Sequence, residues 1–319
     1  MGEFDLIARH FDRPAPEGVL GVGDDAALLA VAPGHELAVS KDLLLQGRHF
    51  LEDTDPAGLG HKSLAVNLSD LGAMGASPLG CLLGLALPRP DEVWLTGFAA
   101  GLHALADASG CPLVGGDTTG SDDGIVISVT VLGQVPAGRA LRRDAARPGD
   151  DIWVSGALGA PDIALRLLLG QLPPDAGRLA ACRPALERPQ PPWRLGPALI
   201  GVAHAAIDLS DGLLQDLGHV LRASACGATL HAPALPEDEA LAGLPASLRR
   251  EAVLSGGETY QLCFTVPPAR ADELRARAGR LSCRITRIGS IEARPGLRVL
   301  DEAGREIATA RAGFDHFRS

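Results

Sequence analysis

Short apolar runs of the β type alternate along this chain with longer segments of helical periodicity, and this alternation constrains the fold more than any other feature. In the first half we expect strands at residues 36–40, 81–87, 113–115 and 125–135, and helices at residues 4–11, 56–75 and 91–109. Long helices between strands indicate an α/β or α+β protein.

A second unit of the same kind follows a polar segment at residues 139–150, which contains Arg-Pro-Gly-Asp and is typical of a linker. Its expected strands are residues 151–154, 261–266 and 284–291, and its expected helices are residues 161–169, 212–224 and 268–279. A chain of 319 residues is long for one hydrophobic core. We therefore predict two α/β domains, residues 1–138 and residues 139–319.

The formal net charge of −10 argues against a general nucleic-acid binder, which needs a basic surface. The same excess of carboxylates suits a protein that collects divalent cations around an anionic ligand. A solvated acidic surface is the simpler explanation of the net charge when it is considered alone.

The cysteines and the uncharged stretches indicate the cellular compartment of the protein. Six cysteines are scattered without a C-x-x-C pair, and several lie in apolar runs, so we expect free thiols in a reducing compartment. The longest uncharged stretch, residues 71–88, is interrupted by Ser77, Pro78 and several glycines and is a poor membrane span. No apolar signal-peptide core is found at the N-terminus. We predict a cytoplasmic protein without a membrane partner.

Turns rich in Gly and Asp lie at the edges of several apolar runs. Asp24 and Asp25 follow a Gly-Val-Gly turn, and adjacent carboxylates need a cation or solvent because they repel each other. An ordinary turn is the alternative explanation. Asp42 lies at the end of an apolar run, where open α/β sheets place ligand groups. A solvated aspartate at a strand end is the better explanation when Asp42 is considered alone.

The helix expected at residues 56–75 carries a polar stripe beside its apolar one. Ser63, Asn67 and Asp70 are spaced i, i+4 and i+7, so they share one helix face. The residues that follow Asp70 are mostly small, which permits close approach by backbone or ligand.

A pair of glycines precedes Asp117 in Gly115-Gly116-Asp117-Thr118-Thr119. Paired glycines let the backbone approach a phosphate, and a neighbouring Asp can hold the metal that bridges phosphate oxygens. The chain contains neither a Walker A loop nor a G-x-G-x-x-G that opens a helix. If it binds ATP, it does so outside the two common nucleotide motifs.

Two similar turns occur in the second half. Asp208 and Asp211 flank Ser210 at an expected strand-to-helix junction, where helix capping is a structural alternative. Gly256 and Gly257 precede Glu258 in the other turn. Several Asp residues without a His cluster favour Mg²⁺ over zinc, because hard cations prefer oxygen ligands. Together these turns predict one phosphate site with several metal ions.

These blocks, in this order, resemble the thiamine-monophosphate kinases, and the resemblance covers essentially the whole chain. Its most specific parts are the run Lys62-Ser63-Leu64-Ala65-Val66-Asn67-Leu68-Ser69-Asp70-Leu71 and the terminal Phe314-Asp315-His316-Phe317. The Gly-Asp-Asp turn is shared more widely, with a superfamily that includes aminoimidazole ribonucleotide synthetase.

The resemblance implies two α/β domains, with the N-terminal sheets of two subunits joined into a barrel at a homodimer interface. It implies that several Mg²⁺ ions are held by Asp25, Asp42, Asp70, Asp117, Asp208 and Asp211, with Ser40 as a lesser ligand. It implies ATP contacts from Gly116, Asp117, Arg143 and Ser210, and thiamine monophosphate contacts from His49, Glu258 and Phe314.

Two residues depart from the family pattern: Lys41 replaces a usual Thr, and Thr259 replaces a common Asp. Lys41 is harmless if only its backbone carbonyl matters, but it alters a metal site if a hydroxyl is needed. The acceptor is a phosphate already ionised at pH 7, so we expect no general base, and Asp70 and Asp117 would act through metal. Another enzyme of the superfamily, such as aminoimidazole ribonucleotide synthetase, and a non-catalytic nucleotide or thiamine-phosphate binding protein remain as alternatives.

Overall fold

A computed structural model describes residues 3–23 and 25–308 of the chain, in two compact units. The first unit comprises Met1–Leu71 and Ala76–Gly138, and the second comprises Gly72–Gly75 and Arg139–Ser319. Among the described helices, none is both long enough and apolar enough to cross a lipid bilayer.

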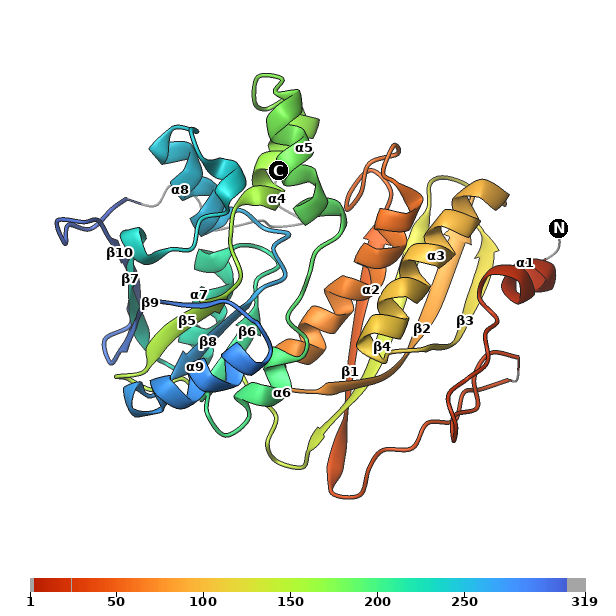
Figure 1. Cartoon of the computed structure of the whole chain (residues 1–319), viewed down its shortest axis with the longest axis horizontal. Helices are drawn as coiled ribbons and strands as arrows, with labels where there is room; N and C mark the ends of the chain where they lie inside the picture. Colours follow the sequence, from red (N-terminus) through yellow and green to blue (C-terminus); the bar gives the residue numbers. More distant parts are fainter. Residues whose placement is uncertain (1–2, 24, 309–319) are drawn as a thin grey trace. The chain divides into compact units, whose positions relative to one another are not determined.

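The first unit is built on a four-stranded sheet with the strand order β1-β4-β2-β3. Its elements are α1 (Glu3–His10), β1 (His35–Leu45), α2 (Pro56–Ala73, whose last two residues belong to the second unit), β2 (Ser77–Leu87), α3 (Glu92–Ser109), β3 (Leu113–Gly120) and β4 (Val126–Pro136). β4 runs antiparallel to β1 and β2, and β3 runs parallel to β2. α2 and α3 lie along one face of the sheet (Figure 1).

The covered face of this sheet is apolar, as the burial pattern of β4 shows. Its side chains alternate between buried and half-exposed, as expected of a strand with one face against a core. The two helices also approach each other closely, because a Cβ on Gly60 would lie 2.0 Å from the Phe98 carbonyl oxygen, and one on Gly101 would lie 1.9 Å from that of Ala57. Only glycine allows this contact between helices.

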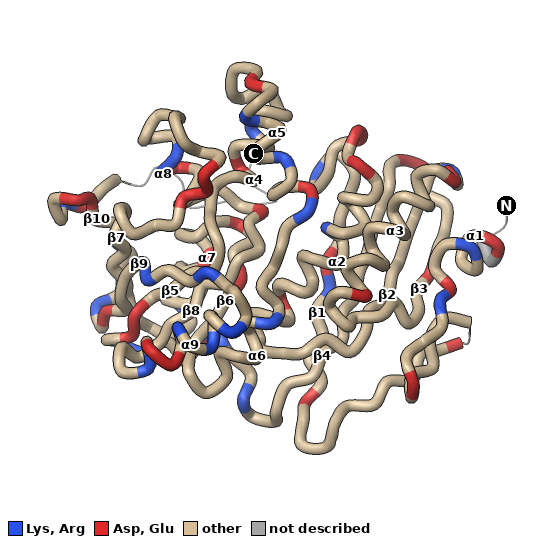
Figure 2. Tube along the Cα trace, in the orientation of Figure 1, with Lys and Arg blue, Asp and Glu red and all other residues tan. Residues whose placement is uncertain are grey.

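The opposite face of the sheet carries exposed apolar side chains. Leu37, Val39, Leu43 and Leu45 of β1 are 50%, 58%, 50% and 40% exposed. β2 and β4 contain no charged residue, as their tan traces show (Figure 2). No helix described in this unit covers that face. β1 and β3 are open edges of the described sheet, so a closed barrel is not found within the single chain.

The second unit contains a six-stranded mixed sheet with the order β10-β7-β9-β5-β8-β6. Its strands are β5 (Asp151–Ser155), β6 (Ala205–Asp208), β7 (Gly227–His231), β8 (Leu262–Val266), β9 (Ile285–Glu292) and β10 (Gly296–Leu300). Its α-helices are α4 (Ala160–Leu168), α5 (Ala176–Glu187), α6 (Leu195–Leu199), α7 (Leu213–Ala223), α8 (Ala246–Ser255) and α9 (Ala271–Arg280). Only β7 and β10 run parallel, and every other pair is antiparallel.

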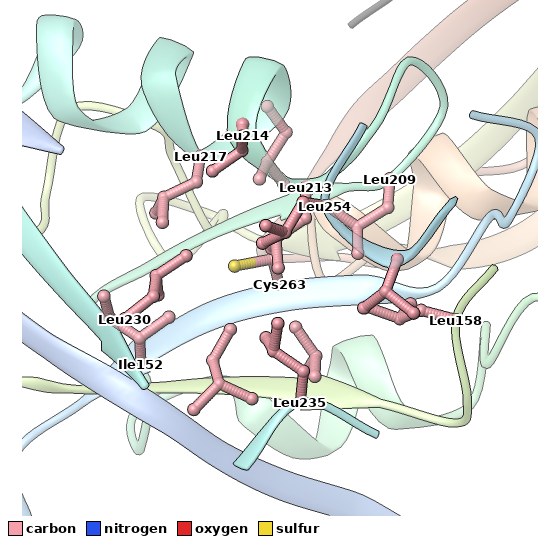
Figure 3. Close-up of a cluster of buried hydrophobic side chains, with 14 of the residues drawn as sticks. Ile152, Leu158, Leu209, Leu213, Leu214, Leu217, Leu230, Leu235, Leu254 and Cys263 are labelled. Carbon is pink, nitrogen blue, oxygen red and sulfur yellow. The ribbon is translucent and has the colours of Figure 1, made fainter. Parts of the chain in front are cut away.

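Apolar clusters cover both faces of this sheet. Ile152 of β5 packs in a large cluster with Leu213 and Leu217 of α7 (Figure 3). Trp153, the next residue of the strand, belongs to another cluster with Leu274 of α9. Neighbouring residues of a strand point to opposite faces, so helices are needed on both sides. β5 is accordingly buried throughout.

The structure confirms a mixed α/β protein with two sheets and corrects several expected elements. β1 continues to Leu45 instead of ending at Ser40, because each of its residues pairs with β4 as far as Leu45 opposite Val126. The sequence patterns do not predict β7 and β10, which at five residues each are too short for clear alternation. They also miss α5, which contains Pro184, and α8.

Candidate active site

The first unit brings together three side chains of the predicted metal set. Ser40 and Asp42 are two residues apart on β1, so they point to the same face of the sheet. The Ser40 hydroxyl donates a hydrogen bond to Oδ2 of Asp70 on α2. Two carboxylates and one hydroxyl therefore lie where the covered face of β1 meets α2.

The rest of the polar stripe of α2 is buried instead of facing solvent. Ser63 Oγ donates to the Leu59 carbonyl oxygen at 2.7 Å, and Asn67 Nδ2 donates to that of Ser63 at 3.0 Å. Both side chains are fully buried, whereas Asp70 at the end of the stripe is half-buried. Only the Asp70 end of the stripe can therefore meet a ligand directly.

Gly116 lies in the same cross-strand row as Asp42. The register pairs Asp42 with Val129, Val129 with Leu83, and Leu83 with Gly116. Neighbouring strands are about 4.8 Å apart, so Asp42 and Gly116 are separated by roughly 14 Å. Ligand distances to Mg²⁺ are about 2.1 Å, which means that one ion cannot bind both Asp42 and the residue after Gly116.

Asp117 is exposed and follows a glycine that no other residue can replace without displacing the backbone. A Cβ on Gly116 would lie 1.9 Å from the Leu83 carbonyl oxygen. The bare backbone at Gly116 and the exposed carboxylate of Asp117 form a second polar group in this unit, distinct from the one at Asp70.

Lys41 points away from the carboxylates. Its Nζ donates to Ser128 Oγ at 2.6 Å, and Ser128 lies opposite Leu43 on the open face of the sheet. The Ser40 and Asp42 side chains are on the other face, so the Lys41 side chain does not take the place of a hydroxyl ligand beside them.

Two further predicted residues of the first unit lie in loops. Asp25 is exposed in the segment before β1, and its neighbour Asp24 lies outside the described residues. His49 is half-buried just after β1, and its Nδ1 accepts the Leu45 N–H at 3.1 Å. An accepting Nδ1 leaves the ring proton on Nε2, so His49 is set up as a neutral donor through that atom.

In the second unit, the two predicted turns are hydrogen-bonded to each other. Asp208 is the last residue of β6 and is buried, and Ser210 and Asp211 follow before α7. The Glu258 N–H donates to the Ser210 carbonyl oxygen at 2.7 Å, and the Tyr260 N–H donates to that of Leu209 at 2.8 Å. The structure therefore places Ser210, which is predicted to contact ATP, beside Glu258, which is predicted to contact the substrate.

The backbone of the second turn is strained. Glu258 has a φ of 65° and Tyr260 a φ of 52°, values that residues with a side chain rarely adopt. A Cβ on Gly257 would lie 2.5 Å from the Ser210 carbonyl oxygen, so glycine is required between them. Thr259, which departs from the family pattern, is buried between the two strained residues. Such strain persists where the surroundings impose it, often at ligand sites.

Asp216, which is not among the residues predicted from the sequence, contacts the turn at Asp211. It is buried in α7, and its Oδ2 accepts the N–H groups of Asp211 and Gly212, both at 3.1 Å. The pKa of its carboxyl is raised to about 7, mainly by burial and secondarily by the charge of Asp211, against the two N–H donors and Arg143. The signal in the sequence is an acidic residue among the leucines at positions 213, 214 and 217 of the helix.

Arg143 is anchored to the other end of α7. Ser224 Oγ donates to the Arg143 carbonyl oxygen at 2.9 Å and accepts the Ala146 N–H at 3.1 Å. The pKa of His219 is lowered by burial and then by the positive charges of Arg222 and Arg143. The positive charge of Arg143 also acts to lower the pKa of Asp216, near the start of α7. Phe314 lies outside the described residues.

The donor set fits Mg²⁺, although the carboxylates do not form a closed cage. Within the described ranges, no three His, Cys, Asp or Glu side chains gather closely enough to hold a metal ion. Mg²⁺ in phosphate-transfer sites is usually held by one or two carboxylates, with waters and substrate phosphates completing its shell. Ser40, Asp42 and Asp70 offer oxygen donors of that kind, and the nearby Asn67 Oδ1 is buried without a partner among the described residues.

Known proteins match this chain over nearly its whole length. The family described as AIR synthase related protein, N-terminal domain, matches residues 23–135, and the corresponding C-terminal domain family matches residues 172–302. A thiamine-monophosphate kinase from Salmonella typhimurium strain LT2 is 43% identical over 325 residues, which cover 99% of this chain and 98% of that protein.

Solved structures give the same result. The crystal structure of thiamine-monophosphate kinase from Stenotrophomonas maltophilia K279a has 43% identity and a TM-score of 0.83, covering 93% of this chain and 94% of that one. A structure described as AaThiL complexed with AMPPCP and TMP has 30% identity and a TM-score of 0.77, covering 91% and 90%. This chain belongs to the thiamine-monophosphate kinase family.

Proposed function

We propose that this protein transfers the terminal phosphate of ATP to the phosphate of thiamine monophosphate, the last step in making thiamine diphosphate. The observation that carries the proposal is the full-length likeness to thiamine-monophosphate kinases. A relative described as complexed with AMPPCP and TMP adds support, because AMPPCP is an ATP analogue and TMP matches the acceptor.

The carboxylates are proposed to hold several Mg²⁺ ions. This set comprises Asp25, Ser40, Asp42, Asp70, Asp117, Asp208 and Asp211. The contact between Ser40 and Asp70 supports the grouping in the first unit. When bound, the ions neutralise phosphate oxygens and favour in-line transfer between two polyanions. The distance of roughly 14 Å between the strand positions of Asp42 and Gly116 supports more than one ion.

ATP is proposed to contact Gly116, Asp117, Arg143 and Ser210. The backbone at Gly116 has no side chain to keep a phosphate away, and Arg143 supplies a permanent positive charge that can pair with phosphate oxygens. The two domains are proposed to have different roles. Residues 1–138 bind ATP and Mg²⁺ and form the dimer, and residues 139–319 complete the nucleotide and substrate site.

Thiamine monophosphate is proposed to contact His49, Glu258 and Phe314. The thiazolium ring of thiamine carries a positive charge, which a carboxylate at Glu258 complements. The neutral His49 ring can donate from Nε2 to a phosphate or hydroxyl oxygen. Phe314 would stack on a ring of the substrate.

The chain supplies positioning and charge, and no base. The attacking oxygen belongs to a phosphate that is already ionised at neutral pH, so no side chain has to remove a proton from it. Arg143 offsets the negative charge of the phosphates, and the carboxylates serve as holders of cations. Asp70 and Asp117 thus act on the reaction only through metal.

We also propose a homodimer in which the N-terminal sheets of two chains join into a barrel. The exposed apolar side chains of β1 and the uncharged strands β2 and β4 support it, because a sheet face of this kind needs a partner. Lys41 would lie within this interface, held by Ser128. A cytoplasmic location is also proposed, since all six cysteines are free thiols and five are buried.

The experiment is incubation of the protein with ATP, Mg²⁺ and thiamine monophosphate, with the product identified by mass. We expect thiamine diphosphate and an equal amount of ADP. Binding of both ligands without turnover would support the alternative of a non-catalytic binding protein. No specific observation favours aminoimidazole ribonucleotide synthetase over this activity.

A further inference from the structure

Asn67 contains a buried hydrogen-bond acceptor that the described structure does not satisfy. The residue lies in α2 and is fully buried, and its Nδ2 donates to the Ser63 carbonyl oxygen at 3.0 Å. Its Oδ1 has no hydrogen-bond partner among the described residues. Buried polar atoms are nearly always paired, so this exception needs an explanation.

Turning the amide over does not remove the mismatch. A flipped amide would direct Oδ1 at the Ser63 carbonyl oxygen, and two acceptors would then face each other. The bond from Nδ2 to Ser63 therefore assigns the orientation of the amide. Oδ1 is left for a donor that the described chain does not supply.

Asn67 lies one helical turn before Asp70. Residues three apart in a helix share a face, with Cβ atoms about 5–6 Å apart. Helical side chains lean toward the N-terminus, so Asp70 leans over the turn that carries Asn67. Because Asp70 accepts a hydrogen bond from Ser40, this face of α2 is directed at β1.

The direction of β1 adds Asp42 to the same group. β1 ends and α2 begins at the same end of the sheet, so the two elements run in opposite directions (Figure 1). The step from Ser40 to Asp42 advances about 6.6 Å along the strand, and the step from Asp70 to Asn67 goes back about 4.5 Å along the helix. Both steps lead the same way, so Asn67 and Asp42 lie on the same side of the Ser40–Asp70 contact.

We propose that Asn67 is a positioning residue of the magnesium site: its Oδ1 accepts a hydrogen bond from a water molecule bound to the Mg²⁺ ion at Asp42 and Asp70. Mg²⁺ retains several waters, and a bound water can reach an acceptor about 5 Å from the ion. Residues that orient metal-bound groups in this way commonly change metal affinity by about 10- to 100-fold when they are mutated. The inference rests on the metal site of the proposed function and adds a residue to it.

The test compares one substitution that removes the acceptor at residue 67 with one that makes it a stronger, charged acceptor. Asn67→Leu keeps the branched shape and the number of heavy atoms and removes the acceptor together with the Nδ2 donor, whereas Asn67→Asp keeps the oxygen and adds a charge. The melting temperature of each full-length chain is measured with a fixed amount of AMPPCP, first in EDTA and then across a MgCl₂ series. Ser63→Ala is the matched control, because Ser63 is equally buried on the same stripe and its hydroxyl is paired with the Leu59 carbonyl oxygen.

For Asn67→Leu we expect a melting temperature in EDTA at or above that of the wild type, because an unpaired buried acceptor is removed. Its midpoint Mg²⁺ concentration should rise about tenfold. For Asn67→Asp we expect a lower melting temperature in EDTA, because a charge is buried, and a larger Mg²⁺-dependent rise than in the wild type. Ser63→Ala should follow the wild-type Mg²⁺ dependence.

Midpoints within about twofold of the wild type for both Asn67 variants would overturn the inference and leave Asn67 a structural residue. If Asn67→Leu does not fold, Asn67→Asp decides alone, and a Mg²⁺-dependent rise no larger than that of the wild type contradicts the inference. A wild-type protein with no Mg²⁺-dependent rise contradicts the proposed metal site itself, so the two failures can be told apart.

Discussion

Asp70→Asn isolates the charge of the carboxylate that joins α2 to β1. Asn keeps an oxygen that can accept the hydrogen bond from Ser40, so the contact between helix and strand can survive. Asp42 lies on the same face of β1 as Ser40, and removal of one negative charge lowers the repulsion within the group. We therefore expect the melting temperature in EDTA to be unchanged or slightly higher.

The expected loss is in catalysis. Metal-ion catalysis contributes several kcal/mol of transition-state stabilisation, and each 1.36 kcal/mol corresponds to a factor of ten in rate. A loss of at least about 2.7 kcal/mol would lower kcat about a hundredfold. Excess Mg²⁺ should recover little of it if, as proposed, the lost carboxylate also sets the position of the ion.

The assay is kcat for thiamine diphosphate formation at several Mg²⁺ concentrations, with melting temperature measured on the same samples. Asp122→Asn is the matched control: Asp122 is exposed in the loop between β3 and β4, and its substitution should be nearly silent. An Asp70→Asn enzyme that keeps more than about a third of wild-type kcat at ordinary Mg²⁺ would refute the metal role of this helix.

Three further predictions concern Asp216, the exposed face of β1 and Phe314. In chemical unfolding with EDTA, the free energy of unfolding of Asp216→Asn should rise relative to that of the wild type by on the order of 4 kcal/mol between about pH 4 and pH 8. Folding raises the pKa of the Asp216 carboxyl from 3.8 to about 7, so the folded wild type loses stability over this range, whereas Asn does not titrate. A difference that is independent of pH contradicts this. Val39→Asp should convert a dimer to a monomer in light scattering, while Val93→Asp, at an 84% exposed position on α3, should not; a Val39→Asp dimer contradicts the proposed interface. Phe314→Ala should raise KM for thiamine monophosphate and leave KM for ATP nearly unchanged, since stacking contributes about 0.5–1.5 kcal/mol; equal weakening of both ligands points to a structural role.

Much of the fold could be predicted because its strands and helices have clear periods. The alternating burial of β4 and the apolar stripe of α2 correspond to the patterns in the sequence. The strand pairing could not be predicted in the same way. β1 looks finished at Ser40, where the apolar run stops, yet it extends to Leu45 because β4 supplies a partner for each residue. β7 has only five residues, too few to show a period.

The sequence patterns predict which residues belong to the candidate site, but not which of them are in contact. The spacing of Ser63, Asn67 and Asp70 places them on one face of α2, but it does not predict that Ser63 and Asn67 are fully buried or that Asp70 contacts Ser40. Asp216 was missed because a single acidic residue in an amphipathic helix usually faces solvent. Its burial under the turn at Asp211 depends on tertiary packing that no local pattern contains.

In the proposed mechanism the acceptor is an ionised phosphate, bound in a site that holds cations and supplies no base. The decisive test gives the enzyme either thiamine monophosphate or free thiamine, with ATP and Mg²⁺, and identifies the products by mass. We expect thiamine diphosphate with one ADP for each molecule formed, and unchanged free thiamine, because its neutral hydroxyl would need a base. Conversion of free thiamine to the monophosphate at a comparable rate would contradict it.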